Sequence, residues 1–385
     1  MKPMILAPDA YLRAVTLRDL TDPAQGPHAL QHVVSNITHA LQARWDCDLR
    51  EHRAHPVVPV EHNYDRLHYP PDGVARDARY TRYVSETTVM RTQTSAMIPS
   101  LLRQVAQDPP RDLLLVCPGL VYRRDQIDRL HTGEPHQLDL WRIAARPLNK
   151  ADLHEMVTVA VHAILPAGEH RCNSAEHPYT RSGLEVEVRD GDEWVEIGEC
   201  GLALPAILEE AGLSTSRYSG LAMGLGLDRL LMLVKRLDDI RALRSTDPRV
   251  AEQMLDLEPY RPVSLQPPIR RDLSLAVDEA RSPEELGDRV RQALGDRVQS
   301  LESVQVLSET AYGRVPPEAR QRIGMRPGQK NALLRIVIRD LVRTLTRQDA
   351  NRLRDDVYAA LHEGSVWQWA GTSGQDATDV RERSS

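Results

Sequence analysis

Between residues 112 and 200 the sequence reads as a run of strands without regular alternation of strand and helix. The strand-like stretches are DLLLVCPG, LVYRRD, LDLWRIA and LEVEVRDGDEWVEIGE. In the last stretch, apolar and polar residues alternate on both sides of Asp190-Gly191-Asp192, which is typical of a β-hairpin. Because a parallel sheet requires regular βαβ alternation, this region predicts an antiparallel sheet flanked by helices, an α+β fold.

Helical periodicity predicts the helices that flank this sheet. Residues 28–45 place apolar side chains on one helical stripe, and residues 95–105 repeat the pattern. A third helix follows the glycine-rich stretch 219–226. The apolar residues of the three helices are Leu30, Val33, Val34, Ile37, Leu41 and Trp45; Met97, Ile98, Leu101, Leu102 and Val105; and Leu227, Leu230, Leu231 and Val234.

A second domain follows residues 258–268, which contain four prolines and predict a linker. RRDLSLAVD reads as a strand, and two further strands are expected near 299–307 and 332–340. Ser282-Pro283-Glu284-Glu285 predicts the capped start of one helix, and Thr346 with Asp349 that of another. With SVWQW as a closing strand, the order is βαββαβ, that of a ferredoxin-like unit. Residues 371–385 predict a disordered tail.

Composition narrows the class of protein. The chain has 385 residues, of which 41% are hydrophobic and 27% charged, as expected for two to three globular domains. No apolar run approaches the length that spans a membrane, and the N-terminus, with Asp9 and Asp19, does not resemble a secretory signal. The four cysteines form no C-x-x-C pair, which indicates free thiols in a reducing cytoplasm rather than disulfides or zinc.

The stretch YRRDQIDRLH, followed by HQLD, carries the most chemistry. Arg123 offers a guanidinium that can pair with a phosphate, and Asp125 and His131 follow it in the same loop. Such a loop can grip a triphosphate and its Mg²⁺. Taken alone, the same residues would more often be those of a solvated charged loop.

The rest of the chain favours the phosphate site, because its motifs resemble those of class II aminoacyl-tRNA synthetases. The glycine-rich segment that leads to Arg229 is similar to motif 3 of these enzymes, and YRRD is similar to motif 2. Phenylalanyl-tRNA synthetase is the nearest resemblance, with further matches in the same order: His62-Asn63-Tyr64-Asp65, Arg91-Thr92-Gln93-Thr94-Ser95, His136-Gln137-Leu138-Asp139, His177-Pro178-Tyr179-Thr180 and Glu199-Cys200-Gly201-Leu202.

The resemblance covers about residues 60–370 and implies a domain plan. Residues 1–25 would be an N-terminal extension and 26–260 the class II catalytic domain. Residues 265–370, which include PPIRRDLSLAVDE and RTLTRQDANRLRDDV, look like the ferredoxin-fold anticodon-binding domain of the same enzymes. This is the layout of the single-chain phenylalanyl enzymes, and it implies a monomer or homodimer that needs no large partner subunit.

The resemblance also implies roles for individual residues. ATP and Mg²⁺ would be the cofactors. The other partners would be an aromatic amino acid and, following the family's pattern, the tRNA for phenylalanine. Arg123 would hold the α-phosphate, Arg229 the γ-phosphate with help from His131, and Asp125 and Glu185 would orient ATP or Mg²⁺. The amino-acid site would comprise Gln93, Ser95, Gln137, Asp139, His177, Tyr179, Gly201 and Ala222, with Gln137 and Asp139 on the ammonium group.

Several residues depart from the family's pattern. Pro135 stands where the family has an adenine-stacking Phe, and His177 and Tyr179 stand where it has two pocket phenylalanines. Asp139 replaces a longer Glu, Gln93 a His, and Arg181 a Glu. Ala222 matches the small residue that sets the depth of the family's pocket, so a ring-sized side chain should still enter.

The chain contains no Phe, although a chain of this length ordinarily has on the order of ten to fifteen. Either every Phe has been replaced, the pocket residues among them, or His177 and Tyr179 select a hydroxylated or otherwise polar ring. Three functions therefore remain open. The chain is a tRNA ligase for phenylalanine or a close analogue, an amino-acid-activating enzyme with another acceptor, or a non-catalytic binding paralogue.

Overall fold

The computed structural model describes residues 5–263 and 267–367. These divide into two compact units. Unit 1 runs from the N-terminus to Leu265 except for Gln126–Asp128, and unit 2 comprises those three residues and the chain from Gln266 onward. Each unit is described by itself below. None of the helices in the described residues is long and apolar enough to cross a membrane.

Unit 1 is built on a seven-stranded sheet with the order β1-β4-β5-β9-β8-β7-β6. Every neighbouring pair in it is antiparallel except β1 and β4. The antiparallel sheet predicted from the sequence is therefore confirmed, with one parallel edge strand. The strands of unit 1 are β1 Asp48–Glu51, β2 Val57–Pro59, β3 Thr88–Met90, β4 Asp112–Leu120, β5 His136–Ala144, β6 His170–Ser174, β7 Thr180–Asp190, β8 Glu193–Ala203 and β9 Ser219–Gly226, of which β2 and β3 form a separate ribbon.

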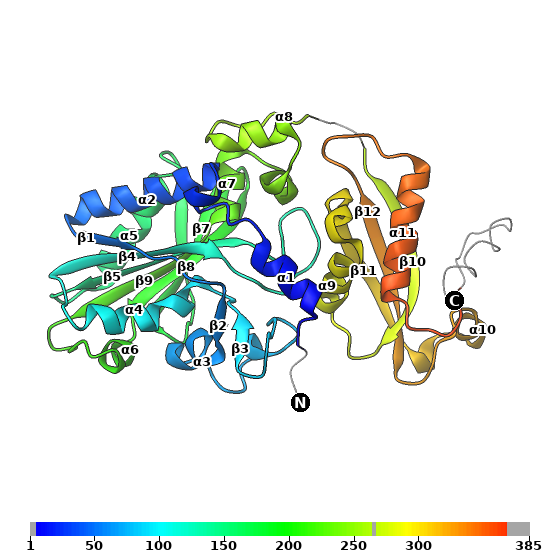
Figure 1. The fold of residues 1–385 in the computed structure, drawn as a ribbon, viewed down its shortest axis with the longest axis horizontal. Coiled ribbons are helices and arrows are strands. Elements are labelled where there is room, and N and C mark those ends of the chain that lie inside the picture. The colour runs from blue at the N-terminus through cyan, green and yellow to red at the C-terminus, as the bar shows by residue number, and fades with distance from the viewer. Residues whose placement is uncertain (1–4, 264–266, 368–385) are drawn as a thin grey trace. The chain divides into compact units, whose positions relative to one another are not determined.

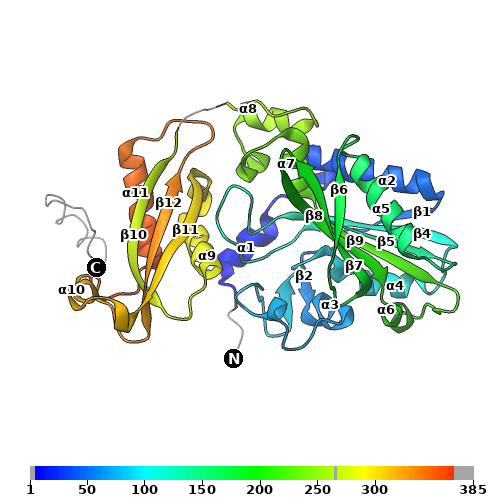
Figure 2. The same cartoon turned by 180° about the vertical axis from the view of Figure 1, so that it is seen from behind.

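Helices cover both faces of this sheet (Figure 1). The α-helices of unit 1 are α1 Pro8–Thr16, α2 Ala29–Trp45, α3 Val60–Asn63, α4 Ile98–Val105, α5 Lys150–His162, α6 Pro205–Glu210, α7 Leu227–Lys235 and α8 Pro248–Ala251. Helices α2, α5 and α7 pack together on one face, and α4 and α6 lie on the other, as the reverse view also shows (Figure 2). The stripes predicted at 28–45, 95–105 and after 226 correspond to α2, to a 3₁₀ helix (Thr94–Met97) with α4, and to α7.

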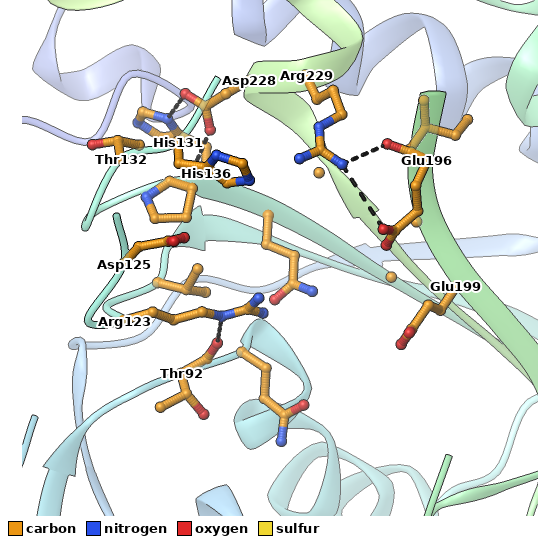
Figure 3. A pocket seen from close by; sticks show the side chains of 18 of the residues that line it. Thr92, Arg123, Asp125, His131, Thr132, His136, Glu196, Glu199, Asp228 and Arg229 are labelled. Carbon is orange, nitrogen blue, oxygen red and sulfur yellow. Dashed lines mark hydrogen bonds and ion pairs between the residues drawn. The ribbon is translucent and has the colours of Figure 1, made fainter. Parts of the chain in front are cut away.

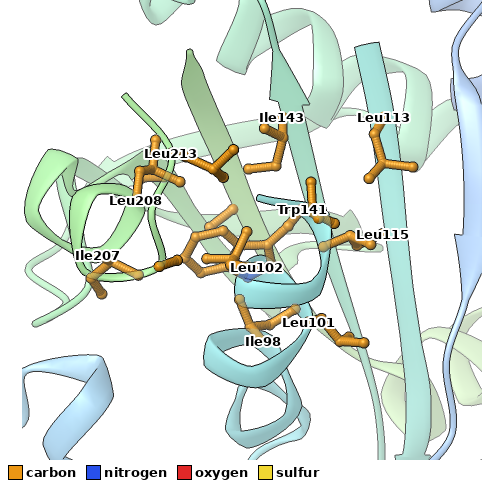
Figure 4. Packing of buried hydrophobic residues seen from close by; sticks show 14 of the residues in the cluster. Ile98, Leu101, Leu102, Leu113, Leu115, Trp141, Ile143, Ile207, Leu208 and Leu213 are labelled. Atoms are coloured by element: carbon orange, nitrogen blue, oxygen red, sulfur yellow. The ribbon is translucent and has the colours of Figure 1, made fainter. Parts of the chain in front are cut away.

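The core beneath α4 and α6 centres on Trp141 of β5, which is fully buried (Figure 4). Leu101 and Leu102 of α4 approach the indole from one element, and Ile207 and Leu208 of α6 from another. Burying a large aromatic side chain removes on the order of 150–250 Å² of surface from water. This core therefore fixes the face of the sheet from which the pocket described below opens.

The stretches DLLLVCPG and LVYRRD predict two strands, but the structure has one strand here. Strand β4 runs through Pro118 and Gly119 and ends at Leu120. Beyond it the backbone bonds to loops instead of a neighbouring strand: the Tyr122 amide donates to the Arg91 carbonyl (2.9 Å), and the Arg123 amide to that of Gly133 (3.0 Å). YRRD is therefore a loop anchored at several points, and the prediction of a second strand was wrong.

Gly119 explains how the chain turns there. Its φ is +153°, and a Cβ on it would lie 2.3 Å from a guanidinium nitrogen of Arg91. Arg91 is buried and donates to the carbonyls of Leu120 (2.7 Å) and Ala54 (3.0 Å). The arginine of the Arg-Thr-Gln-Thr-Ser motif thus lies against the end of β4 and positions the loop that follows.

The segment that the sequence sets apart as an N-terminal extension, 1–25, lies within unit 1 from Ile5 onward. Leu20 and Thr21 are buried, and the Leu20 amide donates to His136 Nε2 (3.1 Å). The first residues of the predicted linker also belong to this unit. The buried ammonium of Lys235 bonds to Asp256 and to the Glu258 carbonyl (2.6 Å), so α7 holds the chain that leaves it.

Unit 2 has a three-stranded sheet with the order β10-β12-β11, all antiparallel. Its elements are β10 Ile269–Asp278, α9 Pro283–Leu294, β11 Leu301–Ala311, α10 Pro317–Arg322, β12 Gln329–Ile338 and α11 Arg347–Leu361. Both predicted capping boxes are present, Ser282 with Glu285 at α9 and Thr346 with Asp349 at α11. Apolar side chains of α9 and α11, such as Val290 and Val357, pack against those of the sheet, such as Leu334 of β12, and form a buried core.

The closing strand predicted at SVWQW is not formed in its first three residues, which are the part of it that the structure describes. Ser365–Trp367 have no strand structure, and residues 368 and 369 lie outside the described residues, as does the tail 371–385. The Glu363 amide nevertheless donates to the Ala276 carbonyl of β10 (2.8 Å). The order of elements in the described part of unit 2 is thus βαβαβα, with the short α10 between β11 and β12.

Candidate active site

A cavity of about 500 Å³ opens on the face of the sheet formed by β5, β9 and β8. Its volume lies within the usual range of ligand pockets, roughly 300–1,000 Å³. Predicted site residues that line it are Gln93, Arg123, Asp125, His131, Gln137, Tyr179 and Arg229. Segments that are far apart in the sequence, from residue 64 to residue 240, therefore meet in one cavity.

The two arginines of the motifs are both held by backbone carbonyls (Figure 3). Arg123 Nε donates to the Thr92 carbonyl (2.9 Å), and Arg229 Nη1 donates to that of Glu196 (2.9 Å). Each keeps further N–H groups for a ligand, since a guanidinium has five donors. Fixed cations at separate places on the wall of one cavity suit an extended anion with more than one charged group, such as a triphosphate.

A buried pair that the sequence analysis missed closes the cavity near Arg229. His136 Nδ1 lies 2.9 Å from Asp228 Oδ1, and the His136 amide donates to the other oxygen of the same carboxylate. His136 Nε2 accepts from the Leu20 amide, which leaves Nδ1 as the protonated nitrogen. Burial raises the pKa of Asp228, but His136 and Arg244 outweigh burial and hold it below its usual value. The pair links the start of β5 to the start of α7.

Three carboxylates and a glycine form a row across the strands that lie beneath the cavity. Asp139 on β5 pairs with Gly224 on β9, Gly224 pairs with Glu199 on β8, and Glu199 pairs with Glu185 on β7. Directly paired residues of an antiparallel sheet project from the same face, so these side chains share the face of the cavity. Gly224 adds no side chain, and a Cβ there would lie 3.3 Å from Gln137 Nε2.

Asp139 lies beneath the wall of the cavity and does not reach its surface. The residue is only 1% exposed. Its Oδ2 accepts a short hydrogen bond from the Ser95 hydroxyl, and its Oδ1 accepts from the Trp141 indole N–H (2.8 Å). Burial raises the pKa of Asp139 to about 7, because those two hydrogen bonds offset only part of the cost of desolvation. Ser95, in the 3₁₀ helix before α4, is likewise buried.

Aromatic rings fill the space beyond this row. The ring of Tyr179 stacks on that of Trp141 (centroids 6.1 Å apart), and Tyr69 and His177 each lie 6.3 Å from it. Burial, reinforced by Asp139, raises the pKa of Tyr179 well above its usual value. Ala222, which pairs with both Trp141 and Gly201, is buried and is not on the wall of the cavity. The described cavity therefore ends at Tyr179 and does not reach Ala222.

The remaining carboxylates of the row differ in their surroundings. His177 Nε2 lies 3.1 Å from Glu199 Oε2, and this contact, opposed by burial and aided by the charge of Arg123, lowers the pKa of Glu199. Burial raises the pKa of Glu196; Arg229 opposes this, whereas the charges of Glu185 and Glu199 add to it. Glu196 and Glu199 line the cavity, and Glu185 lies outside its wall on β7, in register with Glu199.

Six of the predicted site residues lie outside the wall of the cavity: Ser95, Asp139, His177, Glu185, Gly201 and Ala222. Sequence reasoning assigned no role to others that do line it, among them Tyr64, Tyr69, Thr92, Glu196, Glu199 and the pair of His136 and Asp228. A signal for Glu199 was available, since it is an acidic residue within the matched segment Glu199-Cys200-Gly201-Leu202. A Gly201 Cβ would lie 2.6 Å from the Thr180 Cβ, so that glycine allows the close approach of β8 to the start of β7.

Comparison with known proteins agrees with this arrangement. Residues 15–254 match the family "tRNA synthetases class II core domain (F)". The phenylalanine–tRNA ligase alpha subunit of Prochlorococcus marinus (strain MIT 9313) is 33% identical over 237 residues, which is 61% of this chain and 69% of that protein. Alpha subunits of the same name are 36% identical over 192 residues in Prochlorococcus marinus (strain NATL2A) and 29% identical over 264 residues in Listeria welshimeri serovar 6b.

The shared length differs among these relatives. The chain spans 56% of the NATL2A protein and 74% of the Listeria protein, and it covers them with 50% and 64% of its own length. The family match begins at residue 15 and ends at residue 254, before β10, so apart from Gln126–Asp128 it lies within unit 1. The matched residues include Arg123, Arg229, the row that contains Gly224, and the lining of the cavity. On this match the chain belongs to the class II tRNA synthetases, a family of aminoacyl-tRNA ligases, through the core domain that carries the cavity.

Proposed function

We propose that the chain activates phenylalanine or a close aromatic analogue with ATP and transfers the aminoacyl group to tRNA. The observation that carries this proposal is the placement of Arg123 and Arg229, each held by a carbonyl, on the wall of one cavity that also exposes Gln93 and Gln137. The names of the relatives point to phenylalanine. The aromatic rings at the inner end, Tyr69 and Tyr179, suit a flat apolar side chain.

Activation needs little acid–base chemistry. The carboxylate oxygen of the amino acid attacks the α-phosphorus of ATP in line, the bond to the bridging oxygen breaks, and pyrophosphate leaves. Arg123 would neutralise the charge on the α-phosphoryl oxygens, and Arg229 with His131 that on the leaving group. The Thr92 and Glu196 carbonyls restrict the two guanidinium groups before ATP arrives, so binding has little side-chain entropy to remove there.

The acidic side chains fit a role beside the triphosphate. Mg²⁺ is usually held by one or two carboxylates together with phosphate oxygens, and it would supply further neutralisation of the phosphates. The described residues contain no group of three or more His, Cys, Asp or Glu side chains arranged for a metal by themselves. Glu196, on the wall, and Glu185, on the neighbouring strand β7, would therefore complete a Mg²⁺ site with the bound nucleotide, and Asp125 would orient the nucleotide from the opposite side.

Transfer to tRNA is supported by the family and by the form of unit 2. Three of the four expected strands and both capped helices are formed in the described part of unit 2, and we assign to this unit the binding of the anticodon. The relatives are named alpha subunits, so whether this chain needs a second subunit is part of the test. The proposal keeps the single-chain layout as a monomer or homodimer in the cytoplasm.

The test is amino-acid-dependent ATP–pyrophosphate exchange on the purified chain with Phe, Tyr, meta-tyrosine and halogenated phenylalanines. Strongest exchange with Phe is expected if His177 and Tyr179 are tolerated replacements. A preference for a hydroxylated ring would make those two residues selective. Exchange without charging of tRNA would indicate another acceptor, and no exchange with any amino acid would overturn the proposal.

A further inference from the structure

The carboxylate expected to bind the substrate ammonium is not placed to do so. Asp139 is 1% exposed and lies outside the wall of the cavity. Both of its oxygens accept hydrogen bonds from the protein, from Ser95 and from Trp141. An ammonium group that replaced the Ser95 contact would leave that hydroxyl unpaired and would require the wall to open. Asp139 is therefore a structural acceptor in this chain.

Glu199 offers a carboxylate on the same floor, one strand beyond Gly224. Both Asp139 and Glu199 pair with Gly224, so their Cα atoms are separated by two strand spacings, about 9–10 Å. Gly224 between them leaves the floor open. The Glu199 side chain is 47% exposed, lines the cavity and projects into it (Figure 3).

The surroundings of Glu199 favour its charged form, but among the described residues they contact only one of its two carboxylate oxygens. His177 Nε2 contacts one oxygen, Oε2, at 3.1 Å. In residues 5–263 and 267–367, no lysine or arginine lies within ion-pair distance of Glu199. A partly buried carboxylate with one free oxygen, facing a cavity, gains most from a cationic donor. His177 Nε2 lies at ion-pair distance from Glu199 Oε2, and the Phe of the family's pattern could not make such a polar contact.

The polar groups near Glu199 are neutral amides, which leaves the charge of a substrate ammonium to a carboxylate. Gln93 and Gln137 lie on the same wall, and each already uses its amide in the protein: Gln93 Oε1 accepts from the Tyr69 hydroxyl (2.8 Å), and Gln137 Oε1 accepts from the Thr94 amide (3.0 Å). An amide is uncharged, and each of these oxygens already accepts a hydrogen bond from the protein, so neither glutamine can neutralise an ammonium group. Of the two glutamates on the wall, Glu196 lies 3.9 Å from the Arg229 guanidinium. Among the described residues here, Glu199 is therefore the carboxylate not paired with an arginine and is the best acceptor for a protonated amine.

We propose that Glu199, which lies beside His177, binds the protonated amine of the amino-acid substrate in place of Asp139. The inference rests on the proposed function, because it concerns the amino acid that is activated. The amine belongs either to the α-position or to the side chain of the substrate. Both have the same chemistry, and the experiment separates them.

The experiment measures KM and kcat of ATP–pyrophosphate exchange for the full chain and for Glu199→Gln, Asp139→Asn and Glu193→Gln. Glu193 is the matched control, since it lies on the same strand but is exposed and away from the cavity. The substrates are L-phenylalanine, its α-hydroxy analogue L-phenyllactate, and 4-(aminomethyl)-L-phenylalanine. Thermal melting of each variant without ligand checks that it is folded.

For recognition of the α-amine, Glu199→Gln is expected to raise KM for L-phenylalanine by about 10–100-fold, the usual range for a hydrogen bond to a charged group, and to leave KM for L-phenyllactate unchanged. For recognition of a side-chain amine, the loss is confined to 4-(aminomethyl)-L-phenylalanine. Asp139→Asn and Glu193→Gln are expected to change KM less than threefold. Both arms support Glu199 as the acceptor.

Two results would overturn the inference. In the first, the wild-type chain is active but Glu199→Gln keeps its KM for every substrate. In the second, Asp139→Asn carries the loss for L-phenylalanine. A wild-type chain that is inactive with all amino acids is a different result, because it removes the proposed function itself and the inference with it.

Discussion

At the scale of single residues, burial decides which carboxylates work as charges and which as structural groups. Asp139 and Glu199 flank the same glycine, yet one has a pKa raised to about 7 and the other has a pKa below its ordinary value. The difference arises from what covers them. Ser95 and Trp141 enclose Asp139, whereas the cavity leaves Glu199 in contact with solvent.

The raised pKa of Asp139 predicts a dependence of stability on pH. Between about pH 4 and pH 7 the folded state keeps a proton that the unfolded chain releases, so the free energy of unfolding falls as pH rises through this window. Asp139→Asn cannot lose that proton. We therefore expect the stability of Asp139→Asn relative to wild type to increase from pH 4 to pH 7 and to level off above. Urea unfolding of both proteins across this range measures it, and a pH-independent difference would contradict the burial of the carboxyl.

Arg123 should act in the activation step more than in binding of the amino acid. Removing one fixed donor that stabilises charge in a transition state typically costs about 10²–10³ in kcat. Arg123→Ala is expected to lower kcat of pyrophosphate exchange by this factor, with KM for the amino acid changed only a few-fold. Arg189→Ala is the control, because Arg189 pairs with Glu169 on the surface. A loss confined to KM for the amino acid would place Arg123 outside the reaction centre.

Residues that lie next to each other in a motif were predictable from the sequence, and residues that meet through the sheet were not. Arg123, His131 and Gln137 come from one continuous stretch, and the structure places all three on the cavity. The burial of Asp139 depends on Ser95, which is 44 positions away. The place of Glu199 depends on which strands pair, and no local pattern specifies that β8 lies beside β9.

At the scale of elements, structure that depends on neighbours in the sequence was predicted well. The capping boxes of α9 and α11 and the hairpin of β7 and β8 all form, since their contacts lie within a few residues. The end of β4 was missed because its amides bond to residues 91, 133 and 135 rather than to a strand that the sequence reveals. Local signals thus give the starts of helices, and distant partners give the ends of strands.

The contribution of a local signal to stability can be measured at the N-terminal cap of α9. The Ser282 hydroxyl accepts from the Glu285 amide (3.3 Å), and Ser282→Ala would leave that donor without its partner. Loss of such a cap typically costs about 1 kcal/mol. We expect this decrease in the free energy of unfolding of unit 2, measured by urea unfolding of the full chain. Ser308→Ala, at an exposed position on β11, should stay within about 0.5 kcal/mol of wild type. Equal effects of the two changes would argue against the cap.

At the scale of the whole chain, each unit has a hydrophobic core made of its own residues. Leu102 is fully buried in the core around Trp141, and Leu334 is fully buried between the sheet and helices of unit 2. The two groups have no residue in common. Deleting a buried leucine side chain typically costs about 2–5 kcal/mol, and the cost falls on the unit whose packing is lost.

This separation predicts two unfolding transitions that respond to different changes. Leu102→Ala should lower only the transition of unit 1 in a calorimetric scan, and Leu334→Ala only that of unit 2. ATP with the cognate amino acid should raise the transition temperature of unit 1 alone, because every residue that lines the cavity belongs to that unit. At a ligand concentration of a hundred times the dissociation constant, the free energy of unfolding of unit 1 should increase by about 2.7 kcal/mol. If both leucine variants and the ligands moved one common transition, the units would unfold together, and the cavity would draw on the stability of the whole chain.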